Sequence, residues 1–532
     1  MSTEIPVSVD KFEKDGVNDE EKRIGDDSFD TVPEAIDREQ EILAVLDLDP
    51  ALNKKMHIVN NMRQTLDEIG WTPYHTKLFF LNGFGYAVDA LQLSLQGIIA
   101  TQAVYEFKPS YERGLTIALY VGMLVGALFW GFSADIIGRK IAFNVSLFIC
   151  SIFTIVAGAA PSWDSLGFFI ALAAFGAGGN LILDTTVFLE YLPSHKQWLV
   201  SWLAAWWGVG CTLAGFVAWG FMSNYSCADP SVAPFTPCTK HNNSGWRYLM
   251  YTMGAMIFAM SVARVTVIRL RETPKFLLGQ GKDAELVENF KELATKYNRH
   301  CSITLEELEA CGTIQTAHSK QRWSFGEFWI HIRSLFVTKK IAYTTILVWL
   351  SWSMIGLAYP LFNVFLPSYL ASRGVEFGVT SVSQTWRNYV LVQICGIFGP
   401  MVGGHLSNWA PLGRRWTMVI GALITMAFFF AYSQVTSQAE NIGYSCIISF
   451  TLEIYYAVLY GFTAEVLPSA HRATGNGIAV AFCRFMGAMS AVIATVANTE
   501  TTGPVFICGA LYGGLALCAF LFPFEPFGKR AS

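Results

Sequence analysis

The stretch "GFSADIIGRK", residues 131–140, places three charged side chains between two strongly apolar runs, and a similar stretch, "GHLSNWAPLGRR", returns in the second half of the chain. A second pair of similar stretches, "EYLPSHKQ" and "EVLPSAHR", also occurs once in each half. The same spacing of 275 residues separates Arg139 from Arg414 and Glu190 from Glu465. Two motif pairs with one spacing indicate that the chain contains two repeats.

The composition around these motifs is that of a membrane protein. Of the 532 residues, 53% are hydrophobic and 15% are charged, whereas a soluble domain carries about 25% charged residues. Apolar runs of about 20 residues are long enough to cross the hydrocarbon core of a bilayer as helices. The sequence therefore predicts an all-α membrane protein with twelve transmembrane helices in two repeats of six. We expect the helices near residues 78–100, 115–134, 141–160, 166–189, 198–221, 247–268, 341–366, 389–407, 416–435, 442–464, 476–497 and 503–523.

Polar segments flank and separate the two halves. The first 75 residues contain 18 Asp and Glu against 8 Lys and Arg, so they cannot form an apolar core and we expect a mostly disordered tail. Phosphorylation or a partner contact of this tail is an open alternative. Lys and Arg in the short loops concentrate on one side, which predicts that both termini and the linker between the halves are cytosolic. The predicted organisation is an acidic tail at 1–75, a six-helix half at 76–269, a linker with an amphipathic helix (283–297) at 270–338, a second half at 339–524 and a cytosolic end at 525–532.

The loop at 222–245 is expected on the opposite side of the membrane. It contains two glycosylation sequons, which begin at Asn224 and Asn242. Cys227 and Cys238 in the same loop are expected to form a disulfide, because this side faces an oxidising compartment. The other nine cysteines stand singly and show no metal-ligand spacing, so we expect no metal site.

Several motifs resemble those of the major facilitator transporters. "GFSADIIGRK" is similar to the family's motif between helices 2 and 3, "EYLPSHKQ" and "EVLPSAHRATGNG" to segments after helices 4 and 10, and "RETPKFLLGQGK" to the segment after helix 6. "GAGGNLILDTTVFLEYLP", "YAVDALQLSL" and "CRFMGA" resemble the synaptic-vesicle-protein-related branch and its fungal members. The chain departs from the family pattern in lacking the usual arginine in "FIALAAFG" of helix 4 and in carrying Asn408 for an acidic residue in the second loop motif. The resemblance covers nearly the whole membrane part and implies a small-molecule substrate held between the two halves; we expect a monomer.

The resemblance also implies a latch at the cytosolic surface. We expect each arginine of the loop motif to pair with the glutamate that follows helix 4 or helix 10. Gly131 is expected to let helix 2 pack closely on a neighbour, and Asp135 to face a helix N-terminus, where a negative charge is favourable. An open alternative is that these charges only anchor loops. The expected members of the latch are Gly131, Asp135, Arg139 and Glu190 in the first half and Arg414, Glu465 and Arg472 in the second, with Arg415 as an alternative to Arg414.

Ionisable residues inside the predicted helices mark the transport pathway, because each is costly in lipid and normally faces the protein interior or a wet cavity. Two arginines, Arg264 and Arg387, lie nearer helix ends, where we expect them to snorkel or to anchor loops. An open alternative to a role in transport is internal pairing, for instance of Glu453 with Arg484. The residues that lie deepest by position are Asp89, Asp184, Glu453 and Arg484.

The types of these residues assign them roles. Arginine stays charged at any working pH, and we expect Arg484 to bind a substrate carboxylate, as organic-anion relatives of the family suggest. An aspartate can change its charge, so we expect Asp89 to carry the coupled proton. Further substrate contacts are expected at Asp184, Glu453, Trp206, Trp207, Tyr359 and Asn363.

The predicted function is secondary active transport of a small organic ion by alternating access, coupled to protons and with an organic acid favoured. The sequence contains no Gly-rich phosphate loop ending in Lys-Ser/Thr, so ATP-driven pumping lacks its machinery. We expect no enzyme activity, no cofactor and no nucleic-acid partner. Transport of a neutral sugar or polyol, and a non-transporting receptor or sensor on the same fold, are the alternatives. The plasma membrane is the expected location, with the vacuolar membrane as the alternative.

Overall fold

Twelve apolar helices dominate the part of the chain that the structure describes. The structure is a computed structural model, and it describes residues 55, 58–59, 66–193, 196, 198–227, 237–268, 271–312, 332–333, 335–336, 338–366, 370, 381–467, 472–496, 503–523 and 525. Among these residues, twelve helices are long and apolar enough to cross a membrane and no residue lies in a strand. The predicted fold class, an all-α membrane protein with twelve spans, is therefore confirmed.

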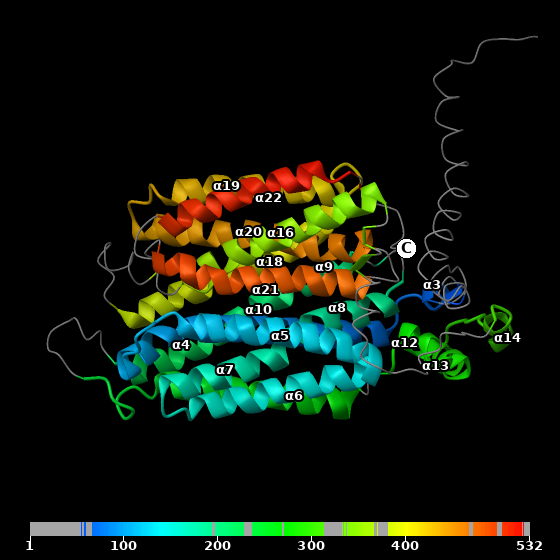
Figure 1. Cartoon of the computed structure of the whole chain (residues 1–532), viewed down its shortest axis with the longest axis horizontal. Coiled ribbons are helices and arrows are strands. Elements are labelled where there is room, and N and C mark those ends of the chain that lie inside the picture. Colours follow the sequence, from blue (N-terminus) through cyan, green and yellow to red (C-terminus); the bar gives the residue numbers. More distant parts are fainter. Residues whose placement is uncertain are drawn as a thin grey trace, which may run out of the picture. The chain divides into compact units, whose positions relative to one another are not determined.

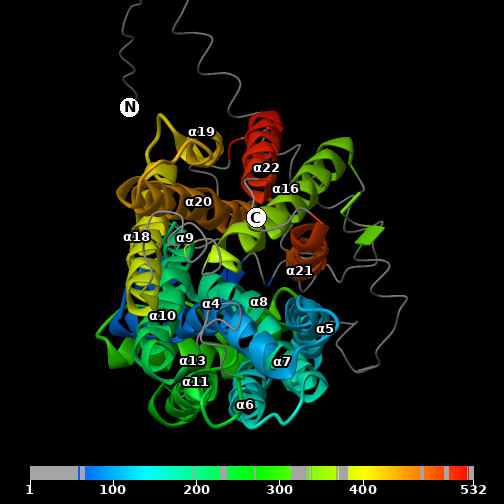
Figure 2. The same cartoon turned by 90° about the vertical axis from the view of Figure 1, so that its left-hand side faces the viewer.

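The spanning helices form two groups, which lie above and below one another when the molecule is viewed along the helices (Figure 2). The first group is α4 (Pro73–Phe107), α5 (Gly114–Ile137), α6 (Arg139–Gly158), α7 (Trp163–Gly178) with α8 (Asn180–Tyr191), α9 (Leu199–Leu203) with α10 (Ala205–Tyr225), and α11 (Gly245–Ala263) with the π-helical turn η3 (Arg264–Ile268). The second group is α16 (Lys339–Asn363), α18 (Val382–Ser407), α19 (Gly413–Tyr432), α20 (Gln438–Val466), α21 (Arg472–Val496) and α22 (Gly503–Leu521).

Four short helices lie beyond one end of the spanning helices, which we call the linker end (Figure 1). They are α3 (Leu66–Ile69), α12 (Pro274–Gly279), α13 (Asp283–Lys296) and α14 (Leu305–Glu309). Helix α13 is the amphipathic helix expected at 283–297. It buries Leu286, Phe290 and Leu293, which follow the spacing of one helix face.

The end of the acidic tail is attached to these helices. Most of 1–75 lies outside the described residues, but Lys55 forms an ion pair with Asp283 of α13. Glu68 accepts hydrogen bonds from the backbone N–H of Ser302, at 2.9 Å, and from its hydroxyl, at 3.0 Å. The first spanning helix also begins at Pro73, inside the segment that the sequence assigned to the tail. The described end of the tail is thus folded, because charged side chains fix it to the linker.

Glycines set the closest contacts between helices. A Cβ added at Gly122 or Gly126 of α5 would lie 2.2 Å from a backbone oxygen of α7, so only glycine permits this approach. A Cβ at Gly131, by contrast, would meet nothing within 4 Å among the described residues. The close-packing role that we expected for Gly131 is therefore wrong, and glycines nearer the middle of α5 perform it.

The two groups of helices contact one another at both ends. At the linker end, Nε1 of Trp202 in α9 donates a hydrogen bond to the Met401 carbonyl of α18, at 3.2 Å. At the opposite end, Nε1 of Trp219 in α10 donates to Oγ of Ser383 in α18, at 2.7 Å. The guanidinium of Arg113 also lies 4.8 Å from the ring centre of Phe365 at this end. The residues between these contacts are enclosed by both groups.

Candidate functional site

An ion pair joins the two groups of helices in their middle. Nη2 of Arg484 in α21 donates hydrogen bonds to both carboxylate oxygens of Asp89 in α4, at 2.6 and 2.8 Å. The two side chains are 2% and 0% exposed. Charges this deeply buried are tolerated only when they are paired and hydrogen-bonded. The suggested pairing of Glu453 with Arg484 is wrong in this structure, because Arg484 binds Asp89.

Helix positions explain why this pair can form. Asp89 lies near the middle of the 35-residue helix α4, far from either end. On α21, Gly487 follows Arg484 by three residues, and a Cβ there would lie 2.2 Å from the ring of Tyr120 in α5. The missing side chain lets α21 approach the first group closely enough for Arg484 to reach Asp89.

Aromatic rings from both groups pack together beside the ion pair. We call Tyr86, Trp207, Trp352, Tyr359, Tyr456 and Tyr460 the aromatic cluster. The ring centres of Trp207 and Tyr456 are 4.5 Å apart, and those of Trp352 and Tyr460 are 4.6 Å apart. The ring centres of Tyr86 and Tyr460 are 5.8 Å apart, so this contact links α4 to α20 across the interface. Tyr456 and Tyr460 lie close enough to Arg484 to interact electrostatically with it.

Two of the four predicted contacts on helices 5 and 7 belong to this cluster. Trp207 lies within 5.6 Å of Tyr359, ring centre to ring centre. Trp206 instead packs on Phe84, at 5.2 Å, and on two further phenylalanines of α4. Asn363 is buried at the end of α16, and its Nδ2 has no hydrogen-bond partner among the described residues. The structure therefore places Trp206 outside the aromatic cluster.

Sequence reasoning missed the tyrosines of helix α20. Tyr456 and Tyr460 follow Glu453 by three and seven residues, which is the spacing of one helix face. Because α20 is apolar nearly all round, its tyrosines do not stand out as an amphipathic stripe. A search for polar groups at this spacing from Glu453 would have found them.

Glu453 lies in the second group of helices and forms no ion pair with any residue that the structure describes. Its side chain is buried, and Oε2 has no hydrogen-bond partner in the part of the chain that the structure describes. Helix α18 packs against its stem, since a Cβ at Gly399 would lie 2.9 Å from Cβ of Glu453. The hydroxyl of Tyr359 faces the carboxyl group. Glu453 is thus connected to the aromatic cluster through Tyr359.

A second buried ion pair lies within the first group of helices. Nη2 of Arg264 lies 3.3 Å from Oδ1 of Asp184, and the guanidinium lies 3.8 Å from the ring centre of Phe143. The two side chains are 1% and 0% exposed. The expectation that Arg264 snorkels is wrong, because an interior carboxylate and ring hold it. Arg387, by contrast, is exposed near the start of α18.

The repeated motifs form one ion pair in each group. Arg139 pairs with Glu190 and lies 3.3 Å from the Thr273 hydroxyl, where the linker begins. Arg414 pairs with Glu465 in the second group. Each pair joins two helices of its own group, so neither bridges the two halves. The side chains of Asp135 and Arg472 lie outside the described residues.

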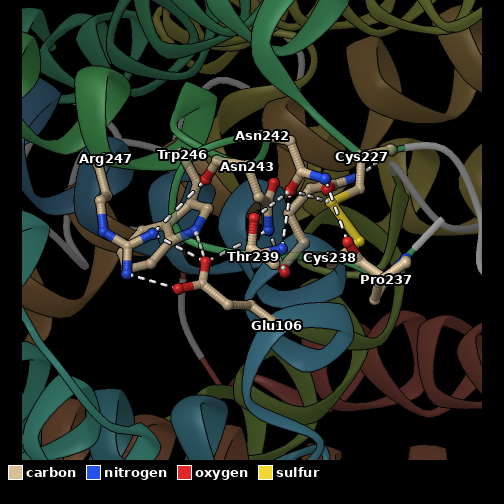
Figure 3. Close-up of a disulfide and its surroundings, with 10 residues drawn as sticks. Glu106, Cys227, Pro237, Cys238, Thr239, Asn242, Asn243, Trp246 and Arg247 are labelled. Atoms are coloured by element: carbon tan, nitrogen blue, oxygen red, sulfur yellow. Dashed lines mark hydrogen bonds and ion pairs between the residues drawn. A yellow bond between two sulfur atoms is a disulfide. The ribbon is translucent and has the colours of Figure 1, made fainter.

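The loop expected outside the membrane is tied to the end of α4 (Figure 3). Cys227 and Cys238 form a disulfide, with Cα atoms 5.8 Å apart, and we call this side the disulfide end. Both carboxylate oxygens of Glu106 accept from Arg247, at 2.7 and 2.8 Å. Of the two sequon asparagines, Asn242 is exposed in a turn beside the disulfide, whereas Asn224 lies in the last turn of α10 and donates to the Gly220 carbonyl, at 2.9 Å.

Known transporters are similar to this chain in sequence and in fold. MFS siderochrome iron transporter 1 of Ceriporiopsis subvermispora is 37% identical over 91% of this chain and 93% of that protein. The niacin transporter NiaP of Acinetobacter baylyi is 26% identical over 79% of this chain and 87% of that protein. The structure of the proton:xylose symporter XylE from E. coli superposes with a TM-score of 0.65 at 16% identity, covering 86% of this chain and 98% of that chain. The profile of the Major Facilitator Superfamily matches residues 81–492. The chain therefore belongs to the Major Facilitator Superfamily of membrane transporters.

Proposed function

We propose that this transporter carries a small organic acid together with a proton. The observation that carries the proposal is the buried ion pair between Asp89 and Arg484, which joins the two halves in the middle of the fold. In this proposal the guanidinium of Arg484 binds the substrate carboxylate and Asp89 binds the proton. The transporter itself, its membrane-spanning helices and a small substrate follow from the family.

The ion pair supplies a physical reason for coupling. A proton on Asp89 removes the negative charge that faces Arg484. A buried cation without a counter-charge costs several kcal/mol, so the protonated site favours an incoming carboxylate on Arg484. Arginine offers a planar fork that matches a carboxylate and keeps its charge throughout. Proton and anion therefore bind together, and loss of the proton restores the pair and expels the anion.

The aromatic cluster supports an organic substrate. Six aromatic rings pack on one another at the interface beside Arg484, and apolar and aromatic side chains are the usual lining of a site for a small organic ligand. A relative named for niacin, a small aromatic carboxylic acid, is consistent with an arginine beside such rings. Asp184 pairs with Arg264 and is better assigned to holding the first group together.

We further propose that the two halves move as rigid bodies around this site. The pairs Arg139–Glu190 and Arg414–Glu465 each stabilise one half at the linker end. Trp202 and Trp219 close the interface at opposite ends, so each contact must open in turn for access from one side. The Lys and Arg distribution supports a cytosolic linker end, and we propose a monomer in the plasma membrane.

Uptake into proteoliposomes tests the proposal. Purified protein is reconstituted, and labelled organic acids and neutral sugars are offered with and without an inward proton gradient. We expect an acid to accumulate only with the gradient. Accumulation of a sugar without dependence on Arg484 would instead establish the neutral-substrate alternative.

A further inference from the structure

We propose that the substrate carries a positive charge in addition to its carboxylate, and that Glu453 and the aromatic cluster bind this cationic end. The inference rests on the proposed function, because it takes Arg484 as the carboxylate site. It defines the substrate class as small amphoteric acids, with an ammonium, quaternary ammonium or protonated ring nitrogen.

The first argument is the environment of Glu453. Its side chain is 4% exposed, and it makes no ion pair with any described residue. The other buried carboxylates of the spanning helices have partners, since Asp89 binds Arg484 and Asp184 binds Arg264. A carboxyl group buried without a charged partner is costly to ionise. A ligand cation would supply the charge that the protein itself provides elsewhere.

The second argument is the direction in which Glu453 lies. Tyr456 and Tyr460 follow it at the spacing of one helix face, so this face of α20 points at the first group of helices. Trp207 of that group lies 4.5 Å from Tyr456, ring centre to ring centre. Tyr359 lies 5.4 Å from Tyr456 and presents its hydroxyl to Glu453. The carboxyl group therefore borders the same cluster of rings that borders Arg484.

The third argument is the chemistry of the rings. Tryptophan and tyrosine faces attract ammonium groups, and several such rings together form the usual protein site for quaternary ammonium ligands. Nε1 of Trp207 and the hydroxyl of Tyr460 have no hydrogen-bond partner among the residues described here. These two groups are therefore available for polar contacts with a ligand whose carboxylate lies at Arg484 and whose cationic end lies at Glu453.

The arrangement also selects against other acids. Arg484 and Glu453 border one cluster of rings, because Tyr456 and Tyr460 interact with Arg484 and the Tyr359 hydroxyl faces Glu453. The second carboxylate of a dicarboxylic acid would meet Glu453 and be repelled, whereas an ammonium at that position would be attracted. Discrimination by a repulsive contact is a common basis of specificity.

Binding of matched ligands to the purified full-length protein tests the inference. The probes are unbranched alkanoates of increasing length, their ω-amino and ω-trimethylammonio derivatives, and the corresponding alkylamines. At the best length we expect the amphoteric compound to bind about tenfold more tightly than the alkanoate. Glu453→Gln should abolish this gain, so that the amphoteric compound and the alkanoate of the same length bind the variant equally tightly. Glu440→Gln, which alters an exposed acid on the same helix, should keep the gain.

The outcomes separate the two proposals. If alkanoates bind through Arg484 but the added ammonium gives no gain, or if the gain survives in Glu453→Gln, the inference is wrong and the proposed function stands. If no acid binds in a way that depends on Arg484, the proposed function fails and the inference fails with it. Should Glu453→Gln not fold, Glu453→Asp keeps the charge and retracts it by one methylene. We then expect the preferred ligand to lengthen by one methylene, and an unchanged preference would overturn the inference.

Discussion

Arg484 and Asp89 lie on different repeats of the chain, and both carboxylate oxygens of Asp89 accept hydrogen bonds from the same guanidinium nitrogen. The pair is buried between two groups of helices that also contact one another at both ends. If Arg484 binds the substrate as proposed, an event at this pair affects both ligand binding and the contact between the halves. A proton or an anion that breaks the pair can shift the equilibrium between conformations, because it changes their relative free energies.

We expect substitutions of Arg484 to show separately what its charge and its planar shape contribute to substrate binding. Arg484→Ala should weaken binding of an organic acid about 10- to 100-fold, because it removes charge-assisted hydrogen bonds. Arg484→Lys keeps the charge but loses the planar fork, so it should weaken binding less. Isothermal titration of the purified variants measures both. Unchanged affinity in Arg484→Ala would show that Arg484 is only the ion-pair partner of Asp89 and does not bind the acid.

We expect Asp89→Asn to uncouple transport from the proton gradient. The amide cannot release a proton, so Arg484 stays available for a carboxylate at every pH. Exchange of labelled for unlabelled acid across a vesicle should continue, while accumulation driven by an imposed pH gradient should stop. Gradient-driven accumulation in this variant would show that another residue carries the proton.

Asp184 is predicted to act through stability rather than through substrate binding. Asp184→Asn leaves the Arg264 guanidinium buried without a charged partner, which should cost about 3–5 kcal/mol. The apolar double variant Asp184→Leu/Arg264→Met should recover much of this loss, because removing both charges leaves none unpaired. Thermal unfolding of the two variants measures the difference, with the exposed Asp164→Asn as control. A stable Asp184→Asn protein with weakened ligand binding would return Asp184 to the substrate site.

The twelve spans and the repeat could be predicted because they depend on local hydropathy and on motifs shared between the halves. The face of each helix that points inward could not be predicted in this way. Trp206 and Trp207 are adjacent, and about 100° of rotation separates their side chains on a helix. Only Trp207 faces the aromatic cluster, and α10 carries no amphipathic stripe from which to choose between them.

Pairings between residues that are far apart in the sequence could not be predicted either. Asp89 and Arg484 are 395 residues apart, and depth alone allowed Arg484 to pair with Glu453 instead. Arg264 lies near the end of its span by sequence, yet it begins the π-helical turn η3 and is directed at Asp184. Contacts with partners in the protein interior determine where these side chains lie, and no pattern in the local sequence indicates those partners.

The predicted topology can be tested with the cysteines of the two ends. In Cys227→Ser, the former disulfide partner Cys238 becomes a free thiol at the disulfide end. A membrane-impermeant maleimide should label it in intact cells. Cys301 and Cys311 at the linker end serve as controls, and they should react only after permeabilisation. Labelling of Cys238 only after permeabilisation would reverse the orientation.

We expect substitutions in the repeated motifs to slow transport without weakening ligand binding. Arg139→Ala removes the partner of Glu190 and the contact with Thr273 at the start of the linker. Arg414→Ala removes the matching pair in the second half, and Asp135→Asn alters the same loop motif. Each change should lower the transport rate about tenfold by shifting the populations of two conformations, since about 1.4 kcal/mol suffices for this effect.

Binding provides the control for this last prediction. The Arg139–Glu190 pair lies at the linker end, whereas Arg484 and the aromatic cluster lie in the middle of the fold. A ligand with equal affinity for both conformations binds unchanged when their populations shift. Titration and initial transport rates are therefore measured on the same preparation of Arg139→Ala. Transport at the wild-type rate would show that the motif only anchors its loop. A loss of affinity in parallel with the loss of rate would mean that the ion pair shapes the binding site itself.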